Sequence, residues 1–427
     1  MTPEIEKRIK TVQAGRVPAG YCSVAGAMMP KEWNLVKLGS IFGNRIDINH
    51  SDYELLSITA DKGVIPRSSI ADKDNSSEDK SKYKHICVGD IGYNTMRMWQ
   101  GVCALSAYDG IVSPAYTILA PSEGVCASYF AYLFKMPFMI NLFYRNSQGL
   151  VDDTRCLKYE WFKNIEVKIP PIAEQKKIAD ILAMQDRVIE LKEMLIAEKQ
   201  SQKKYLMSVL LGDDFKKPFK LNGVTIDKKK WRDVSLSDCC LLEGQYGLNA
   251  PACAFKDNLP KYIRITDIDE DGRYNRSSVA YVDVDDYENY LLNENDVLLV
   301  RTGSTTGKSY LYDKNDGKLV YAGFLIRFNI NPEFVDKRVV YACLNTNSYW
   351  KWVGVMSMRS GQPGINATEY SKYRFKIPLD KKEQKAIAEV LSAADEEISL
   401  LQKDLEQEKL KKKSLMQLLL TGLVRVQ

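Results

Sequence analysis

Two similar stretches, EQKKIADIL at residues 174–182 and EQKAIAEVL at residues 383–391, decide the fold of this chain. The similarity continues through 174–211 and 383–420, where 15 of 38 aligned positions are identical. Neither copy contains glycine or proline inside it, and each is followed by a glycine, Gly212 or Gly422, as helix C-termini often are. Just before each copy, Lys-Ile-Pro ends a strand-like run. The sequence therefore predicts two helices of about 40 residues, each roughly 60 Å long.

Apolar residues recur with heptad spacing along both predicted helices, which is typical of helices that bury one stripe against a partner. This predicted seam consists of Ile178, Leu182, Ile189, Ile196, Leu206 and Leu210 in the first helix, and Ile387, Leu391, Ile398, Leu405, Leu415 and Leu419 in the second. Glu408 and Lys412 are polar members of the second seam. Because the two seams match in length, we predict that the helices pair antiparallel within one chain.

The remaining segments also repeat in outline. Each opens with Trp-x-x-Val-x-Leu, at Trp33 and at Trp231, and contains short β-type runs between Gly, Asn and Asp turns. This pattern favours irregular α+β globules over a doubly wound sheet. The predicted order is an N-terminal arm (1–32), a first globule (33–170), a central helix (171–212), a linker (213–230), a second globule (231–378) and a C-terminal helix (379–427). We therefore expect an α+β, pseudo-two-fold chain in which two long antiparallel coiled-coil helices separate two globules.

The composition excludes several classes of protein. The 427 residues are 45% hydrophobic and 27% charged, and the longest apolar stretch, 129–144, is interrupted by Lys135, Pro137 and Asn141, so no membrane span is expected. Nine cysteines without a C-x-x-C pair, behind a charged N-terminus, indicate a cytoplasmic protein. With only two histidines, a metal site or a histidine-based catalytic triad is not expected. The net charge of +5 is spread over the chain and predicts no strongly basic domain.

Two motifs resemble chemical sites but depart from them. RTGSTTGKS, residues 301–309, is similar to a phosphate-binding P-loop, but three residues instead of four separate its glycines, and the following residues read as a strand. DIDEDG, residues 267–272, matches the first half of a calcium loop, but the required glutamate is replaced by Ser278. We interpret this second motif as a hairpin turn. No catalytic residue is predicted.

Polar and aromatic residues gather in loops of both globules. Arginine forms bidentate hydrogen bonds with the edge of guanine, and asparagine and glutamine form them with the edge of adenine. The predicted DNA-binding residues are Tyr93, Asn94, Arg97, Trp99, Gln100, Arg145, Asn146 and Gln148 in the first globule, and Arg301, Thr302, Ser304, Thr305, Lys308, Arg359, Ser360, Gln362 and Asn366 in the second. Within this set, we expect Arg301 to reach a base edge and Lys308 to hold a phosphate.

Two globules alternating with two long helices resemble the specificity subunit of type I restriction-modification systems. ELLSITADKGVIPR (54–67), GYNTMRMWQG (92–101) and GIVSPAY (110–116) are similar to one kind of target recognition domain, and YIRITDID (262–269) with VRTGSTTGKSYLY (300–312) to another. The resemblance implies a non-catalytic chain that reads a split double-stranded DNA sequence. It also implies two modification subunits that carry S-adenosylmethionine, and restriction subunits that use ATP and Mg²⁺.

Two alternatives stay open at this point. The globules of a pure scaffold would bind proteins instead of DNA. A nucleotide-binding enzyme would use the loop at residues 301–309.

Overall fold

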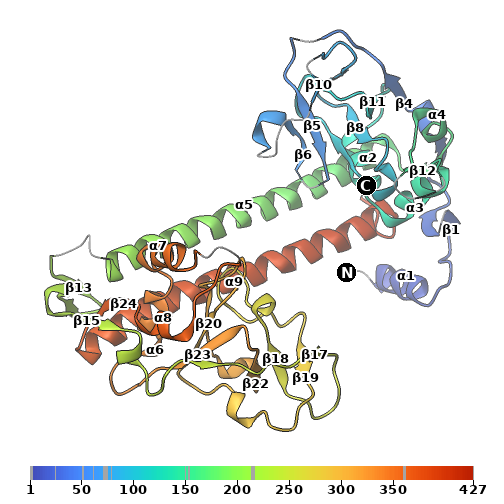
Figure 1. Ribbon diagram of the computed structural model, residues 1–427. Helices are drawn as coiled ribbons and strands as arrows, with labels where there is room; N and C mark the ends of the chain where they lie inside the picture. Colours follow the sequence, from blue (N-terminus) through green and yellow to red (C-terminus); the bar gives the residue numbers. More distant parts are fainter. Residues whose placement is uncertain are drawn as a thin grey trace. The chain divides into compact units, whose positions relative to one another are not determined.

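The computed structural model describes residues 3–24, 26–50, 52–60, 62–70, 76–77, 79–149, 151, 154–212, 217–358 and 362–426. The chain divides into two compact units (Figure 1). Unit 1 consists of Met1–Lys192 and Asp404–Gln427, and unit 2 of Glu193–Lys403. Two helices of 40 residues, α5 (Ile172–Leu211) and α9 (Lys381–Leu420), each contribute one half to either unit. The two long helices predicted from the sequence are therefore present.

Unit 1 is built around a four-stranded antiparallel sheet with the order β4-β11-β8-β9. Its elements before α5 are α1 (Pro3–Gln13), β1 (Tyr21–Val24), β2 (Ala27–Pro30), β3 (Asn34–Lys37), η1 (Leu38–Ser40), β4 (Phe42–Arg45), β5 (Leu56–Thr59), β6 (Gly63–Pro66), η2 (Arg67–Ser69), β7 (Lys84–Ile86), β8 (Ile91–Asn94), η3 (Met98–Gln100), β9 (Cys103–Leu105), β10 (Gly110–Val112), β11 (Tyr116–Pro121), α2 (Ala127–Leu133), α3 (Pro137–Asn146), α4 (Tyr159–Phe162) and β12 (Glu166–Ile169). The smaller pairs are β1-β2, β3-β12, β5-β6 and β7-β10. The main core lies between the central sheet, helices α2 to α4 and the adjoining ends of α5 and α9.

Unit 2 repeats this plan, because its antiparallel sheet β16-β23-β20-β21 has the same strand order by position in the chain. Its elements are β13 (Phe219–Leu221), β14 (Val224–Ile226), η5 (Lys228–Lys230), β15 (Arg232–Ser235), η6 (Ser237–Cys239), β16 (Gln245–Tyr246), β17 (Ala252–Cys253), β18 (Lys261–Ile263), η7 (Ile265–Asp267), β19 (Ala280–Val282), η8 (Glu288–Tyr290), β20 (Asp296–Val300), β21 (Ser309–Leu311), η9 (Lys314–Asp316), β22 (Leu319–Tyr321), β23 (Leu325–Asn329), α6 (Lys337–Cys343), α7 (Asn347–Met356), α8 (Ala367–Ser371) and β24 (Arg374–Ile377). A further sheet, β17-β19-β18-β22, includes one parallel pair, β18-β22. The mixed α+β class and the repeated topology confirm the predicted fold class.

The long helices pair antiparallel in each unit. In unit 1, Gln185 Nε2 donates to Glu408 Oε2 (2.7 Å), and the Lys412 ammonium lies 2.5 Å from Asp186. Lys192 forms an ion pair with Asp404 in the same unit, so the partner number on α9 falls from Lys412 to Asp404 as the number on α5 rises from Asp186 to Lys192, which is the antiparallel direction. The two polar members of the predicted seam are thus paired, and the hydrogen bond from Gln185 lowers the pKa of Glu408.

In unit 2, ion pairs join Lys199 to Glu397 at 2.5 Å and Lys203 to Asp395. Across the whole predicted seam none of the twelve apolar side chains is exposed. Nine are buried, and Ile189, Leu206 and Leu415 are partly buried.

The glutamine of the repeated Glu-Gln pair has the same structural role in both units. Gln175 is buried, donates to Pro170 O (2.9 Å) and accepts from the amide of Cys126, which caps α2. Gln384 is equally buried, donates to Pro378 O (2.9 Å) and accepts from the amide of Asp336, which caps α6. Each glutamine therefore fixes the start of a long helix to the helical layer of its own globule, which explains why the stretch recurs.

The N-terminal arm of unit 1 packs against the end of the chain. Arg8 donates to Leu423 O (2.7 Å), and the Tyr21 hydroxyl donates to Gly422 O (2.6 Å). Gly422 has a φ of +69°, and an added Cβ would lie 2.6 Å from Pro30. A glycine is therefore required where α9 ends. Within the described ranges, no helix has the length and apolar character needed to cross a bilayer.

Candidate nucleic-acid interface

Equivalent loops of the two central sheets carry eight of the seventeen predicted DNA-binding residues. The loop between β8 and β9, residues 95–102, corresponds to the loop between β20 and β21, residues 301–308. In unit 1 the amide of Leu157 donates to Thr95 O (2.8 Å), and in unit 2 the amide of Ile365 donates to Arg301 O (2.9 Å). These matching bonds hold the segment before α4, or before α8, beside the loop. Each unit therefore presents a composite surface made by segments far apart in the sequence.

The surface in unit 1, called loop surface 1, consists of Arg97, Trp99, Gln100, Tyr144, Arg145, Gln148 and Arg155. The indole of Trp99 donates to Met96 O (2.9 Å), and its ring lies 6.0 Å from the ring of Tyr144. The Arg155 guanidinium lies 4.0 Å from the centre of the same Tyr144 ring. Aromatic faces and arginine planes offer stacking partners and hydrogen-bond donors together.

The structure separates the predicted residues of unit 1 into exposed and internal ones. Arg97, Gln100, Arg145 and Gln148 are exposed, and Trp99 is partly exposed. Asn94 is partly buried at the end of β8 and accepts from the amide of Met96 (3.0 Å), while Asn146 donates to Leu142 O (2.8 Å) within its own helix. Both asparagines therefore support local backbone.

Tyr93 requires a correction. Its side chain is fully buried, its hydroxyl donates to Leu157 O (3.1 Å), and burial raises its pKa. The prediction that Tyr93 belongs to a DNA-contacting surface is wrong, because strand alternation directs this ring into the core of unit 1.

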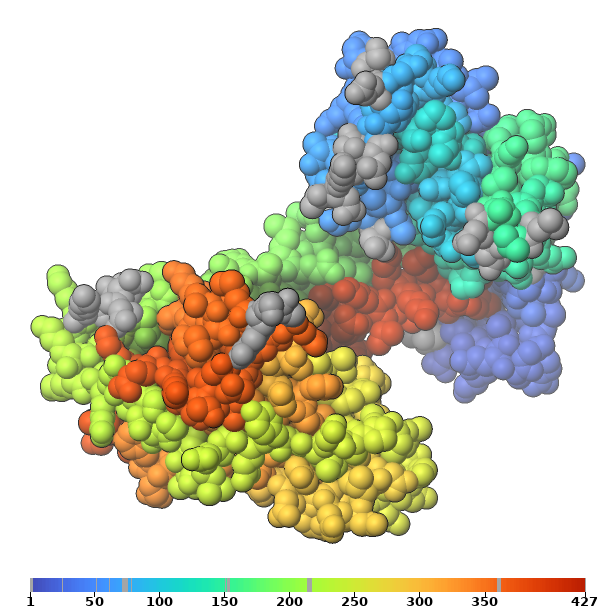
Figure 2. Space-filling model, in the orientation of Figure 1, coloured from blue at the N-terminus to red at the C-terminus, as the bar shows by residue number. Residues whose placement is uncertain are grey.

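The surface in unit 2, called loop surface 2, consists of Tyr246, Arg301, Thr302, Ser304, Thr305 and Gln362. The Arg301 guanidinium lies 4.7 Å from the centre of the Tyr246 ring, which is 43% exposed. Thr302 Oγ1 donates to Pro363 O (3.3 Å), whereas Ser304 and Gln362 are exposed. The segment that contains α7 and α8 lies at the surface of the same unit (Figure 2, orange).

Two glycines shape the loop of unit 2. Gly303 and Gly307 have φ values of +88° and +94°, which side chains other than glycine rarely adopt. A Cβ on Gly307 would also lie 2.7 Å from Val353. Because residues 309–311 form strand β21, as predicted, no helix N-terminus follows the loop to bind a nucleotide phosphate.

Two further predicted residues have local partners. The Lys308 ammonium lies 2.6 Å from Glu270, and its side chain is only 13% exposed. Asn366 caps α8: its Oδ1 accepts from the amide of Glu369 (2.9 Å), and its own amide donates to the Glu369 carboxylate (2.8 Å). Arg359 and Ser360 lie outside the described residues.

Three surface residues were missed from the sequence: Tyr144, Arg155 and Tyr246. Tyr144 contacts Trp99 and Arg155, and Tyr246 contacts Arg301. Contacts between residues so far apart along the chain leave no periodic pattern in the sequence. The only signal available was composition, since tyrosine and arginine are common where proteins contact nucleic acid.

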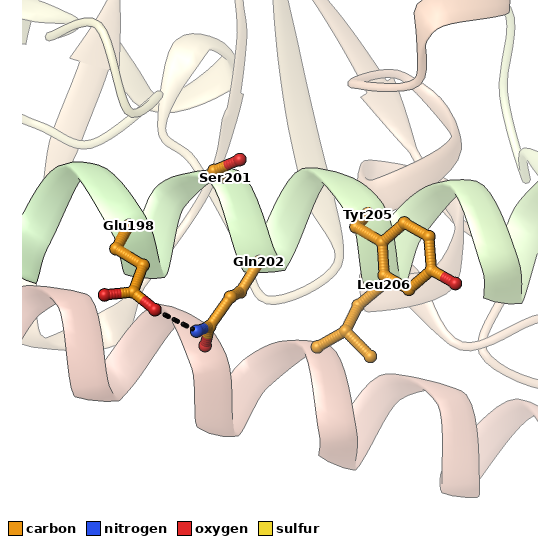
Figure 3. Close-up of a pocket in the computed structure, with 5 residues that line it drawn as sticks. All are labelled: Glu198, Ser201, Gln202, Tyr205 and Leu206. Atoms are coloured by element: carbon orange, nitrogen blue, oxygen red, sulfur yellow. Dashed lines mark hydrogen bonds between the residues drawn. The ribbon is translucent and has the colours of Figure 1, made fainter.

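A separate hollow lies on α5 in unit 2 (Figure 3). Glu198, Ser201, Gln202, Tyr205 and Leu206 line it, and Gln202 Nε2 donates to Glu198 Oε1 (3.0 Å). Tyr205 is 64% exposed, so this part of the helix surface carries uncovered aromatic area.

Comparison with known proteins identifies the family. A model described as the type I restriction modification DNA specificity domain matches residues 30–199 and 228–410. The MjaVIII specificity subunit of a type I restriction enzyme from Methanocaldococcus jannaschii is 29% identical over 275 residues, which cover 62% of this chain and 63% of the relative. A putative MjaX specificity subunit from the same organism is 26% identical over 372 residues, 83% of this chain and 82% of the relative.

Solved structures agree on the fold. A chain from work on complex assembly and conformational transition of the type I R-M system has a TM-score of 0.56 at 14% identity, covering 92% of this chain and 98% of its own length. The type I restriction-modification S subunit from M. genitalium has a TM-score of 0.55 at 12% identity, and the match covers 91% of this chain and 96% of that subunit. Two matches to one family model, placed over the two globules and much of both long helices, show that this chain belongs to the type I restriction modification DNA specificity family.

Proposed function

We propose that this chain is the non-catalytic DNA-recognition subunit of a type I restriction-modification complex. Loop surface 1 reads one half of a bipartite double-stranded sequence, and loop surface 2 reads the other. One observation carries the proposal: two sheets of identical strand order present equivalent loops, held by equivalent amide-to-carbonyl bonds, with different side chains. Equal frameworks with unequal side chains suit the reading of two different half-sites.

The chemistry of the loop surfaces supports a DNA partner. Exposed Arg97, Gln100 and Gln148 in unit 1, and partly exposed Arg301 with exposed Gln362 in unit 2, offer the planar donor and acceptor groups that match base edges. The tyrosines beneath Arg155 and Arg301 hold those guanidinium planes in place before DNA arrives. Such preorganisation reduces the entropy lost on binding.

The long helices support a second part of the proposal, which is that they set the distance between half-sites and dock the modification subunits. Uncovered apolar side chains lie along them: Ile172, Met184, Leu191 and Leu410 in unit 1, and Met194, Leu195, Tyr205 and Leu400 in unit 2. Exposed apolar surface of this kind favours a protein partner. Two modification subunits with S-adenosylmethionine, and restriction subunits with ATP and Mg²⁺, would then supply the chemistry.

Mapping of methylated bases tests this function. Co-expression of the chain with the modification subunits of its operon is expected to methylate one bipartite sequence throughout a host genome. Modification subunits expressed without the chain serve as the control and should leave that sequence unmodified. Methylation of the same sequence in the control would contradict the proposal, and so would a complex that assembles without any sequence preference in its methylation.

Substitution of Arg301 tests base reading in unit 2. If its guanidinium contacts a base, Arg301→Ala should cost about 1–3 kcal/mol on the specific site and relax preference at one position of one half-site. Arg301→Lys is the matched variant, because it keeps the charge and loses the planar fork. Binding titrations of the assembled methylase at several salt concentrations measure both effects.

Lys308 provides the contrasting case in the same loop. Its side chain is only 13% exposed and its ammonium pairs with Glu270, so we expect it to act as a charge and not as a base reader. Lys308→Ala should weaken binding evenly across sequences and lower the salt slope by roughly one. Equal loss on all sequences for Arg301→Ala would assign Arg301 to phosphate contact or folding and refute its role as a base reader.

A further inference from the structure

Both histidines of the chain lie together in unit 1, although 35 positions separate them. His85 belongs to β7, and its amide donates to Asp47 O (2.8 Å), which brings the segment after β4 alongside this strand. The amide of Asn49 donates to Ser81 O (3.2 Å) and places His50 on the same side. Strand β10, which pairs with β7, begins directly after Asp109. Three separate segments thus converge on His85.

The side chains of this cluster face one another. His50 Nε2 lies 2.8 Å from Asp47 Oδ1, and His85 Nδ1 lies 3.1 Å from Asp47 Oδ2. The other ring nitrogen of His85, Nε2, lies 2.5 Å from Asp109 Oδ1. The two imidazole rings are 4.9 Å apart, and the ring of Tyr53 packs 4.8 Å from that of His85.

We propose that Asp47, His50 and His85 bind one divalent metal ion of the zinc class, with Asp109 as the residue that orients His85. One ligand atom from each of the three residues lies within 4.8 Å of the others. Zinc bonds of about 2.0–2.2 Å to nitrogen and oxygen place neighbouring ligand atoms roughly 3.3 Å apart in a tetrahedron. The 2.8 Å and 3.1 Å separations join the two histidines to different oxygens of Asp47, and the three ligand atoms all lie within 4.8 Å of one another, so side-chain rotation brings them to that spacing when an ion binds.

The hydrogen-bonding capacity of the His85 ring favours a cation between His85, Asp47 and His50. A neutral imidazole carries one N–H group, so only one of the two carboxylate contacts of His85 is then a hydrogen bond. If Nε2 donates to Asp109, the lone pair of Nδ1 faces Asp47 and His50. A metal ion held by Nδ1 removes that conflict, and a carboxylate on the far ring nitrogen is the usual partner of a metal-bound histidine.

The site is open to solvent on one side. The side chains of Asp47 and His50 are 46% and 31% exposed, whereas that of His85 is 11% exposed. An ion can therefore enter from solution, and water can complete its coordination. Cys87 Sγ lies 3.9 Å from the ring nitrogens of His85 and forms, with His85 and Asp109, a second group of ligand atoms within 4.8 Å. We assign the ion to the first group because it uses both histidines and leaves Asp109 on the far nitrogen of His85. The ion would connect strand β7, which carries His85, with the segment that follows β4 and carries Asp47 and His50. The low histidine count had argued against a metal site, but folding brings both histidines to one place.

Titration of the full-length, chelator-treated chain with Zn²⁺ and Co²⁺ tests the proposal. One equivalent is expected to bind in a histidine-dependent manner, with a Co²⁺ spectrum of nitrogen and oxygen ligation and no thiolate charge-transfer band. His85→Ala and His50→Gln should each lower the affinity at least tenfold, and Asp109→Asn by about 10–100-fold. Zn²⁺ should raise the thermal midpoint of the wild type but not that of His85→Ala.

Cys87→Ser is the matched control, because it alters a neighbouring group outside the ligand set and should leave the affinity unchanged. If His85→Ala fails to fold, the more exposed His50→Gln still tests the site. Equal metal uptake by the wild type and a double His50→Gln/His85→Ala variant would overturn the proposal. A strong thiolate band that Cys87→Ser abolishes would overturn the ligand set.

Discussion

Ile398→Asp is expected to lower the free energy of unfolding of the isolated chain by about 3–5 kcal/mol, because it places an unpaired carboxylate in the helix seam. Ile398 lies in the part of α9 that belongs to unit 2 and is 2% exposed. The nearest ion pairs of the seam cannot neutralise the new charge, since Lys199 and Lys203 already pair with Glu397 and Asp395. Urea denaturation followed by helical circular dichroism measures the change.

Leu400→Asp is the matched control for this prediction. Leu400 lies two residues farther along the same helix and is 58% exposed, so the same carboxylate remains in water. Its substitution should change the free energy of unfolding by no more than about 0.5 kcal/mol. Similar losses for both variants would mean that the cost comes from helix propensity or net charge, and the assignment of position 398 to a buried seam would fail.

The seam shows what sequence alone can predict. A heptad pattern over about 40 residues places the twelve seam side chains on one stripe, and this is why the two helices and the burial of Ile398 could be predicted from residue spacing. Their antiparallel pairing was predicted from the equal length of the two seams. The partners of Glu408 and Lys412 were not accessible, because the register between two helices depends on contacts along their whole length. Likewise, the roles of Gln175 and Gln384 became visible only when their bonds to Cys126 and Asp336 were known.

The loop surfaces show where such prediction stops. The two loops and the segments beside them were found from their polar composition, yet Tyr93 in the same stretch lies in the core. Composition cannot tell which face of a three- or four-residue strand is buried. The Arg301–Tyr246 contact joins residues 55 positions apart, and the meeting of His50 with His85 depends on strand pairing. Contacts of this kind follow from tertiary packing and leave no local pattern.

Exchange of residues 33–170 for the first globule of another family member is expected to change one half of the methylated DNA sequence and leave the other half unaltered. The fold of unit 1 makes this exchange feasible. Strand β3, at the start of the exchanged segment, pairs with β12 at its end, and in this pair Asn34 lies opposite Ile169. Both ends of the exchanged segment therefore meet in one small sheet, directly before α5. Mapping of methylated bases in cells that express the hybrid methylase measures the result.

Besides the shared apolar core, two hydrogen bonds join the exchanged segment to α5 and constrain the choice of donor globule. Gln175 accepts from the backbone amide of Cys126, which any residue except proline can supply at that position. Asp186, in contrast, accepts from the Tyr132 hydroxyl (2.8 Å). A donor globule should therefore keep a tyrosine at the position of Tyr132, so that Asp186 and its ion pair with Lys412 stay intact.

The reciprocal exchange of residues 231–378 is the matched control. Strands β15 and β24 pair with each other in the same way, and in this pair Arg232 lies opposite Ile377. It should change the other half-site only. In both hybrids the helices α5 and α9 are unaltered, so the number of base pairs between the half-sites should stay constant. A hybrid that changes both halves, or changes their spacing, would show that the globules do not read DNA independently and that the helices alone do not set the gap.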